Sequence, residues 1–493
     1  MTDLIVVGSG AAGATAAIDA AVAGAEVLIL EALPKFGGTA SVSGGGTCIA
    51  GSPLQEQRGV EDDPGMALED WVAFGGPEAN VEWARRYLEA SVPELFVWLA
   101  EMGVEWTTLN AQEGNRVPRW HAPGGAGGEI MAALEARVGT LPNIRCQFDA
   151  RVVDLIQEGG RVVGVVAEIA DLGRVEFRAP AVLLASGGFN SNPDMVREYT
   201  SEAARGAPVL LGGGRGAVGG GHRLLEEIGA DFVNMDAVWM YPYGTPDPKD
   251  LASGRGLVLR GMDSDIWVNS QGERFHNEAK RGGASGTRAL LAQDPPMCWS
   301  IVDAHIAGEI AVADPYYRRG ATPDRERTWE LLNTSPHIRH ADTLVDLAEV
   351  MGVDRGTFAE TVREHNQLLA SGVDVDPAFG RRLTGLAPLE TPPFYAIQFF
   401  PLARKNFGGV RTDLECRVLR ADGSAIPGLF AAGEVAGMAG GHINGRAGLE
   451  GTMLGPSLYS GRVAGRAMVG SAVSQKLIAS LPSASSCCPS SGW

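Results

Sequence analysis

The apolar residues of this chain fall into short unbroken runs, most of which end at glycine or an acidic residue. Such runs occupy residues 4–7, 27–30, 181–185 and 429–432, and the second run belongs to an expected strand at 26–30. Strands that are apolar throughout, rather than alternating, are typical of parallel sheets covered on both faces. An Ala-rich stretch at 11–23 predicts a helix between the first two runs. The pattern therefore predicts an α/β fold.

The remaining periodicity predicts further elements along the chain. Residues 66–104 look helical, and shorter helices are expected at 129–138, 222–228 and 458–468. Between residues 144 and 185 the pattern is that of β-strands, with Gly159-Gly160 as a hairpin turn.

The alternation of predicted strands and helices weakens near residue 235 and returns near residue 400. Residues 235–400 have fewer βα alternations and many prolines, which indicates an inserted capping or substrate domain. The first domain is expected to comprise residues 1–234 and 401–474, because the run that ends in Gly433-Glu434 repeats the early pattern. The two ends of the chain would then close around one cofactor. Residues 475–493 are Ser-rich and predicted to be a disordered tail.

A glycine turn between the first strand and the first helix points to chemistry. Gly8-Ser9-Gly10-Ala11-Ala12-Gly13 has the G-x-G-x-x-G spacing, and Glu31 ends the second strand. In dinucleotide-binding folds these glycines permit the tight turn, the approach of a pyrophosphate and helix packing, while the acid accepts from a ribose hydroxyl. The alternative is a Gly-rich turn in an ordinary α/β protein. The surrounding strand, helix and acid favour a dinucleotide site.

Three other glycine-rich loops have two interpretations each. Residues 34–46 either line the cofactor or are flexible, and their exit from the second strand favours the lining. Residues 116–128, with two Arg and a His, are a solvated loop or an anion site. Residues 212–221 contain seven glycines and are either low-complexity or a backbone nest near cofactor oxygens.

Composition excludes several classes of partner. The 493 residues suit two or three domains, and a net charge of −18 argues against a nucleic-acid or anionic-membrane partner. There is no 18-residue apolar run, and Met1 leads directly into the first strand, so we expect neither a membrane span nor a signal peptide and a cytoplasmic location. The six cysteines, including Cys487-Cys488 in the tail, have no metal-binding spacing, and no metal is expected. Because the chain shows no motif for an electron-transfer cofactor of its own, electrons would pass to or from an unknown donor or acceptor.

Several of these motifs together resemble one family. The opening turn with Glu31, the loop at 37–45, residues 185–189, 269–278, 408–410 and 429–434 are similar to the FAD-dependent fumarate reductase/succinate dehydrogenase flavoprotein superfamily. Residues 451–457 and 461–465 resemble its 3-ketosteroid Δ1-dehydrogenase branch. The likeness covers nearly the whole chain to about residue 470.

The resemblance implies a Rossmann-like FAD-binding domain of the glutathione-reductase type with an inserted α+β capping domain. It implies FAD as the cofactor and a small carbonyl- or carboxyl-activated substrate. The expected FAD contacts are Gly8, Gly10, Ala11, Ala12, Gly13, Glu31, Ala32, Gly38, Thr39, Ala40, Ser43, Gly44, Gly45, Val152, Val153, Ala185, Ser186, Gly187, Gly188, Asn190, Gly433, Glu434, Gly451, Thr452, Met453 and Leu454.

Catalytic candidates follow from the same likeness. Arg281 stands near the position of the proton-donating Arg of the fumarate reductases. Arg260 matches a further Arg, but the relay Glu three residues before it is Leu257 here. Arg404 stands where a His is expected.

The remaining candidates lie near the C-terminus and at the start of the expected capping domain. Arg446 is close to the position of a carboxylate-binding Arg in the reductases and of a Tyr in the steroid dehydrogenases, and His442 is nearby. Tyr241-Pro242 replaces a His-Pro pair. The missing His residues and relay Glu make fumarate itself an improbable substrate.

The sequence therefore predicts an FAD-dependent oxidoreductase acting on a CH–CH bond next to a carbonyl or carboxylate. It would be a ketone or ketosteroid-type dehydrogenase or an ene-reductase, with hydride transfer at flavin N5 and oxyanion stabilisation by cations or donors. The alternatives are an O₂-using oxidase or hydroxylase, and a non-catalytic flavin subunit that transfers electrons.

Overall fold

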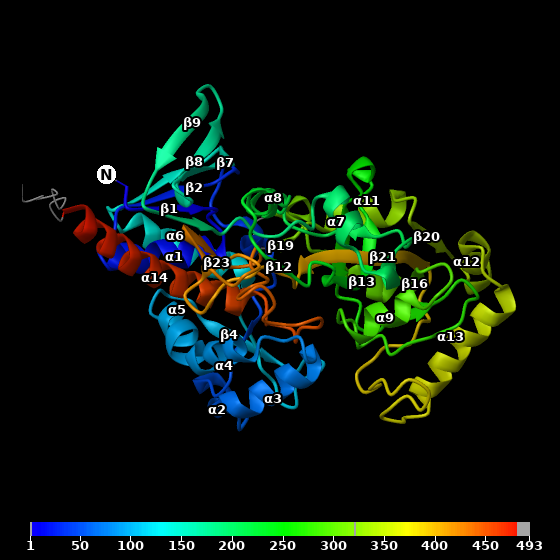
Figure 1. Ribbon diagram of the computed structural model, residues 1–493. Coiled ribbons are helices and arrows are strands. Elements are labelled where there is room, and N and C mark those ends of the chain that lie inside the picture. Colours follow the sequence, from blue (N-terminus) through cyan, green and yellow to red (C-terminus); the bar gives the residue numbers. More distant parts are fainter. Residues whose placement is uncertain (1, 320–321, 481–493) are drawn as a thin grey trace, which may run out of the picture.

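The central sheet holds the two ends of the chain together. The computed structural model describes residues 2–319 and 322–480 (Figure 1). Its six-stranded sheet has the order β23-β24-β10-β1-β2-β6, in which all strands but β23 are parallel. The strands are β1 (Leu4–Val7), β2 (Val27–Leu30), β6 (Ile144–Gln147), β10 (Ala181–Leu184), β23 (Arg417–Leu419) and β24 (Ala425–Ala431). Residues of β1, β2 and β10 are all buried, as expected for strands covered on both faces. The predicted α/β fold is confirmed.

The terminal helix seals one face of this sheet. Helix α14 (Leu454–Ser480) packs along α1 (Ala11–Val22), and the Thr15 hydroxyl donates to the Leu458 carbonyl at 2.9 Å. Helix α6 (Ala126–Gly139) also contacts α1. Helix α14 begins earlier and ends later than the helix predicted at 458–468, and it continues past residue 475, into the segment predicted as a tail. The rest of that predicted tail, 481–493, lies outside the described residues.

Smaller elements surround this sheet. The helical region comprises α2 (Pro53–Gln57), α3 (Pro64–Gly75), α4 (Val81–Ala90), η2 (Ser91–Val97) and α5 (Trp98–Ala100). A three-stranded sheet pairs β3 (Thr47–Cys48), β5 (Trp120–Pro123) and β4 (Trp106–Asn110) in that order. A meander of β7 (Ala150–Glu158), β8 (Arg161–Ile169) and β9 (Gly173–Arg178) projects from the domain, turning at Gly159-Gly160 as predicted (Figure 1).

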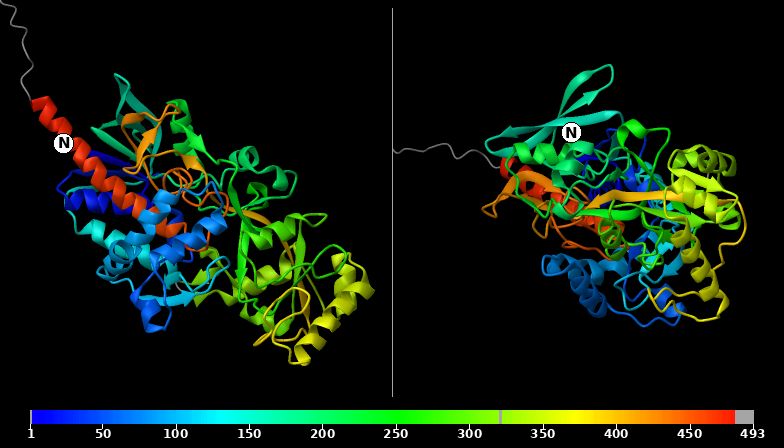
Figure 2. Two further views of the ribbon diagram at one scale, coloured as in Figure 1. Left: turned by 60° about the horizontal axis from the view of Figure 1, so that its bottom comes forward. Right: turned by 90° about the vertical axis from the view of Figure 1, so that its right-hand side faces the viewer.

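A second sheet forms the other end of the molecule (Figures 1 and 2). Its order is β15-β16-β21-β13-β14-β17, and β11 and β20 also pair with β21. The strands are β11 (Leu210–Leu211), β13 (Val238–Pro246), β14 (Gly256–Arg260), β15 (Ile266–Val268), β16 (Cys298–Val302), β17 (Ala311–Val312), β20 (Ile338–Ala341) and β21 (Phe394–Asn406). Its helices are α9 (Ser285–Leu291), α10 (Ala304–Glu309), α11 (Arg325–Thr334), α12 (Leu344–Met351) and α13 (Arg355–Ala370). We call this unit the cap.

Short elements join the cap to the first domain. They are α7 (Pro193–Tyr199), α8 (Gly220–Glu227), and the strand pair β12 (Phe232–Val233) and β22 (Gly409–Val410). A separate small hairpin, β18 (Arg318–Arg319) and β19 (Thr322–Pro323), lies at the cap surface. Strand β21 is long and leads directly into Gly408-Gly409, so its end lies at the junction of the two units. Within residues 2–319 and 322–480, no helix has the length and apolar character needed to cross a membrane.

Candidate functional site

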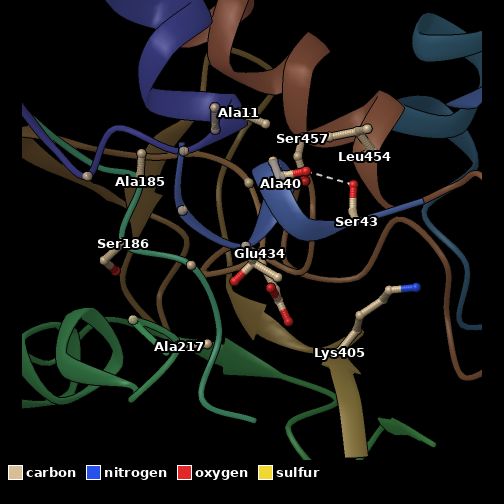
Figure 3. Close-up of a pocket in the computed structure, with 18 of the residues that line it drawn as sticks. Ala11, Ala40, Ser43, Ala185, Ser186, Ala217, Lys405, Glu434, Leu454 and Ser457 are labelled. Carbon is tan, nitrogen blue, oxygen red and sulfur yellow. Dashed lines mark hydrogen bonds between the residues drawn. The ribbon is translucent and has the colours of Figure 1, made fainter. Parts of the chain in front are cut away.

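A cavity of about 300 Å³ lies where the carboxyl ends of the parallel strands meet the cap. Its walls come from the turns after β1, β2, β10 and β24, from the start of α14, and from the cap strands β13, β14 and β21. Figure 3 shows residues of these distant segments gathered around one space. In open α/β sheets this edge is the usual place for a ligand.

The glycine turn after β1 adopts the geometry that its sequence predicts. Gly8 has φ of 105°, and a Cβ at this position would lie 2.5 Å from the Ala185 carbonyl oxygen, so a larger residue cannot be accommodated. The turn places the amino end of α1 at the cavity, where the first N–H groups of a helix have no intrahelical partner.

Glu31 is held at the end of β2, against the same cavity. Its carboxylate accepts from the Ser9 N–H and hydroxyl, both at 2.8 Å, and from the Leu33 N–H at 2.9 Å. These bonds fix the direction of the carboxylate, whose remaining lone pairs are available to a ribose hydroxyl.

Most of the residues expected to contact the cofactor line this cavity. They are Gly8, Gly10, Ala11, Ala12, Glu31, Ala32, Gly38, Thr39, Ala40, Ser43, Gly44, Gly45, Val152, Ala185, Ser186, Gly187, Gly433, Glu434, Gly451, Met453 and Leu454. Five expected residues are not in the lining: Gly13, Val153, Gly188, Asn190 and Thr452.

Two of these five have clear structural tasks. A Cβ at Gly13 would lie 1.9 Å from the Gly8 carbonyl oxygen, so Gly13 allows α1 to pack on the turn. The Asn190 amide donates to Glu434 at 3.1 Å and therefore acts behind the cavity wall.

A hydrogen-bonded group of three side chains forms the polar end of the cavity. The Tyr241 hydroxyl donates to Glu450 Oε1 at 2.7 Å and accepts from Lys405 Nζ at 3.1 Å. All three residues line the cavity. We call this group the Lys–Tyr–Glu triad. Sequence reasoning identified Tyr241 but missed Lys405 and Glu450.

Burial sets the protonation of this triad. It raises the pKa of Tyr241 well above its usual value, and the neighbouring Glu450 charge raises it further. Burial also lowers the pKa of Lys405, against the pull of Glu450. Tyr241 is therefore a neutral phenol, whose proton is already directed at a carboxylate.

A β-bulge brings two adjacent cations to the cavity. On β21, Lys405 pairs with Trp239 and Ala403 pairs with Met240, so Arg404 is an extra residue without a partner on β13. Neighbouring residues of a regular strand point to opposite faces, whereas here Arg404 and Lys405 both line the cavity. Arg404 Nη1 donates to the Gly212 carbonyl at 2.7 Å, and its Nε is buried with no hydrogen-bond partner among the described residues.

Arg260 and Glu434 complete the charged lining. Arg260 ends β14, and its guanidinium lies 5.6 Å from the ring centroid of Tyr243, which stacks on Tyr241 at 5.2 Å. Glu434 accepts from the Asn406 N–H at 3.1 Å. Burial raises the pKa of Glu434 to about 7.

The structure does not bring Arg281, Arg446 or His442 to the cavity lining. Arg281 donates to the Met262 carbonyl at 2.6 Å and pairs with the buried carboxylate of Asp265 inside the cap. Its side chain is thus used by a cap ion pair, contrary to the expectation of a proton donor.

Arg446 and His442 instead join two surface loops. Arg446 pairs with Glu78 at 3.0 Å and with Asp236 at 2.8 Å, and 48% of its side chain is exposed. His442 Nδ1 lies 2.7 Å from the Glu78 carbonyl oxygen. The loop at 445–451 turns Glu450, not Arg446, toward Tyr241.

Comparison with known proteins identifies the family. A family model described as an FAD binding domain matches residues 3–454. A KsdD-like steroid dehydrogenase of Mycobacterium tuberculosis is 31% identical, over 94% of this chain and 95% of that protein. The chain belongs to the FAD-binding fumarate reductase/succinate dehydrogenase superfamily.

Two further proteins show the breadth of this relationship. A fumarate reductase (cytochrome) of Shewanella frigidimarina is 31% identical to this flavoprotein, over 94% of its chain and 76% of the relative. The open conformation of a flavocytochrome c3 fumarate reductase superposes with a TM-score of 0.76 at 28% identity, covering 96% of this chain and 78% of the other. The flavoprotein is thus an FAD-dependent oxidoreductase that acts on CH–CH bonds.

The lining residues fit FAD. The Ser186 hydroxyl is buried at the cavity without a partner among the described residues, the space beside Gly10 is open, and Glu31 is directed as a ribose acceptor requires. No cluster of three or more His, Cys, Asp or Glu in the described ranges is arranged to hold a metal ion.

Proposed function

We propose that this flavoprotein dehydrogenates a saturated ketone at the CH–CH bond next to its carbonyl, and that Tyr241 and Glu450 remove the proton. FAD, when bound, supplies the hydride acceptor. The observation that carries the proposal is the Lys–Tyr–Glu triad within the cavity that fits the cofactor.

The direction of the hydrogen bonds supports dehydrogenation. A carboxylate only accepts, so the proton between Tyr241 and Glu450 belongs to the phenol and is directed at Glu450. When a substrate C–H bond breaks, its proton passes to the Tyr241 oxygen as the phenol proton passes to Glu450. The Lys405 ammonium, 3.1 Å from the same oxygen, stabilises negative charge that develops there.

The cations of the lining support a substrate with a single developing oxyanion. Arg260, Arg404 and Lys405 line this end of the cavity together with Glu434 and Glu450. The positive charge of these side chains can hold the oxygen of an enolate as it develops. Arg404, which lines the cavity beside Lys405, is a cation that suits this oxygen.

The test is anaerobic mixing of the yellow, FAD-loaded protein with saturated 3-ketosteroids and cyclic ketones, followed through the flavin absorbance. We expect bleaching by a saturated ketone. Tyr241→Phe and Glu450→Gln should keep FAD and slow this reduction by about 10²- to 10⁴-fold, the usual contribution of a positioned acid or base.

Tyr199→Phe is the matched control. Its phenol also donates to a glutamate, Glu226 at 2.8 Å, but it does not line the cavity, so its rate should equal that of the unaltered protein. Bleaching by no ketone, together with reoxidation of the dithionite-reduced protein by an enone or enoate, would show that the reaction runs as an ene-reduction. A Tyr241→Phe protein with an unchanged rate would remove the triad from the chemistry.

A further inference from the structure

Trp120 lies in the cavity wall, and neither the family likeness nor the catalytic triad accounts for it. It belongs to β5, between two residues that are fully buried on the other side of the strand. The loop that contains it was expected either to bind an anion or to be solvated. In the structure its arginines pair with carboxylates of the same domain, and the indole faces the cavity instead.

The glycines of the neighbouring loop shape the place for this indole. A Cβ at Gly46 would lie 1.8 Å from Trp120 Nε1, and one at Gly44 would lie 3.7 Å from Cζ2. Only a residue without a side chain at position 46 leaves room for the indole. The backbone of this glycine loop therefore supports the indole on one side. The indole itself is then a flat surface against which a ligand could pack.

The residues that flank Trp120 are locked. Arg119 is fully buried and makes a two-pronged ion pair with Asp62, at 2.8 and 2.7 Å, and a further one with Asp70 at 2.5 Å. His121 is equally buried, and its Nε2 lies 2.7 Å from the Ser52 hydroxyl. With both neighbours held by short polar contacts, Trp120 has little freedom to leave the wall.

Strand pairing connects Trp120 with the triad end of the cavity. Trp120 pairs with Cys48 on β3, and the Cys48 N–H donates to the carbonyl of Gly451 at 2.9 Å. Gly451 follows Glu450, whose carboxylate accepts from Tyr241. The indole and the proton-transfer group are therefore on connected parts of one wall.

We infer that Trp120 is a specificity-determining residue, a rigid aromatic platform for the apolar ring body of the substrate, while the cations hold its oxygen. This inference rests on the proposed function, since it deepens the choice of a ketone by requiring a cyclic one. Large rigid aromatic side chains provide contact area at low entropic cost, and the platform is already ordered before a ligand arrives.

Binding without turnover tests this inference. Enones that correspond to the dehydrogenated product are titrated into the oxidised, FAD-loaded protein, and the dissociation constant is read from the change in the flavin spectrum. The set comprises a four-ring 3-keto-enone, a one-ring cyclohexenone, an acyclic enone and a ring-bearing enoate. Trp120→Ala should weaken binding of the four-ring enone by about 10- to 100-fold and of the acyclic enone by less than about threefold, and Trp120→Phe should lie between.

The matched control is Trp106→Ala, on the adjacent strand β4. Trp106 stacks on Phe96 and donates to its carbonyl at 3.0 Å without lining the cavity, so its removal should not alter the ring preference. FAD content is measured for every variant. An equal loss for cyclic and acyclic ligands, or a loss of FAD instead of ligand, would overturn the platform.

The outcomes also separate this inference from the proposed function. If only the ring-bearing enoate binds and Trp120→Ala weakens it, Trp120 is a platform although the substrate is not a ketone. If ketones are dehydrogenated but Trp120→Ala leaves the preference unchanged, the proposed function stands without the platform. Failure of every ring-bearing compound to perturb the flavin spectrum would refute the platform.

Discussion

Gly10→Ala offers a sharp test of where the pyrophosphate of FAD lies. An ideal Cβ at Gly10 meets no protein atom within 4 Å, and Gly10 has φ of −70°, which alanine adopts without strain. The apoprotein should therefore tolerate the methyl group, with a change in unfolding free energy of at most about 0.5 kcal/mol. Because Gly10 lines the cavity at the amino end of α1, we propose that the pyrophosphate lies there, in the space that the methyl group would occupy.

The expected loss is one of affinity. Adding a methyl group to a filled site typically costs about 1–3 kcal/mol, which corresponds to a dissociation constant about 5- to 150-fold higher. The assay is calorimetric titration of the apoprotein with FAD, combined with thermal unfolding in the absence and presence of FAD. Gly10→Ala should unfold like the unaltered apoprotein and gain less from FAD.

Gly13→Ala is the control with the opposite behaviour. Its Cβ would lie 1.9 Å from the Gly8 carbonyl oxygen, so it should destabilise the apoprotein itself. A Gly10→Ala protein that binds FAD as tightly as the unaltered protein would refute the placement of the pyrophosphate over Gly10.

Three further substitutions test other parts of the structure. Arg119→Met removes the partner of two buried carboxylates, Asp62 and Asp70, and should lower the unfolding free energy by about 3–5 kcal/mol in denaturant titrations. The pair of Arg178 with Glu158 is more than half exposed, so Arg178→Met should lower it by less than about 1 kcal/mol. Equal effects of the two substitutions would contradict the argument from burial. Arg446→Ala removes only exposed ion pairs and should leave kcat within about threefold of the unaltered value, while a loss of orders of magnitude would restore Arg446 to the substrate. His222 is buried between Phe189 and Phe232, and burial lowers its pKa to about 3. Because the unfolded chain binds this proton near pH 6.5 and the folded state does not, the stability associated with His222 is lost as pH falls from about 6.5 toward 3. His222→Leu should flatten that part of the profile of melting temperature against pH, and an unchanged profile would show that other groups dominate acid unfolding.

The cofactor half of the molecule could be predicted because its requirements are local. A turn that needs glycine at Gly8, an acid at the end of β2 and apolar runs for buried strands all leave marks within a few residues. These marks predicted a dinucleotide site, and the family, the FAD cofactor and the CH–CH chemistry that the resemblance implied are confirmed.

The polar end of the cavity depends on tertiary structure and was predicted only in part. Arg404 and Lys405 reach the same space because of a bulge, which alternation along a strand does not predict. Glu450 reaches Tyr241 through the path of a glycine-rich loop, and that path also turns Arg446 to the surface. A visible signal for Lys405 was its place beside Arg404 near the end of a largely apolar strand.

The position of β10 between β1 and β24 has a consequence for folding during synthesis. The glycine turn leaves the ribosome first, but one neighbour of β10 and the helix that covers α1 are made last, as the bond from Thr15 to Leu458 illustrates. Until residue 431 has emerged, one edge of β10 is unpaired, and such edges promote association between chains. A nascent chain that stops before residue 425 is therefore expected to aggregate and to bind no FAD, although it already contains the whole G-x-G-x-x-G turn.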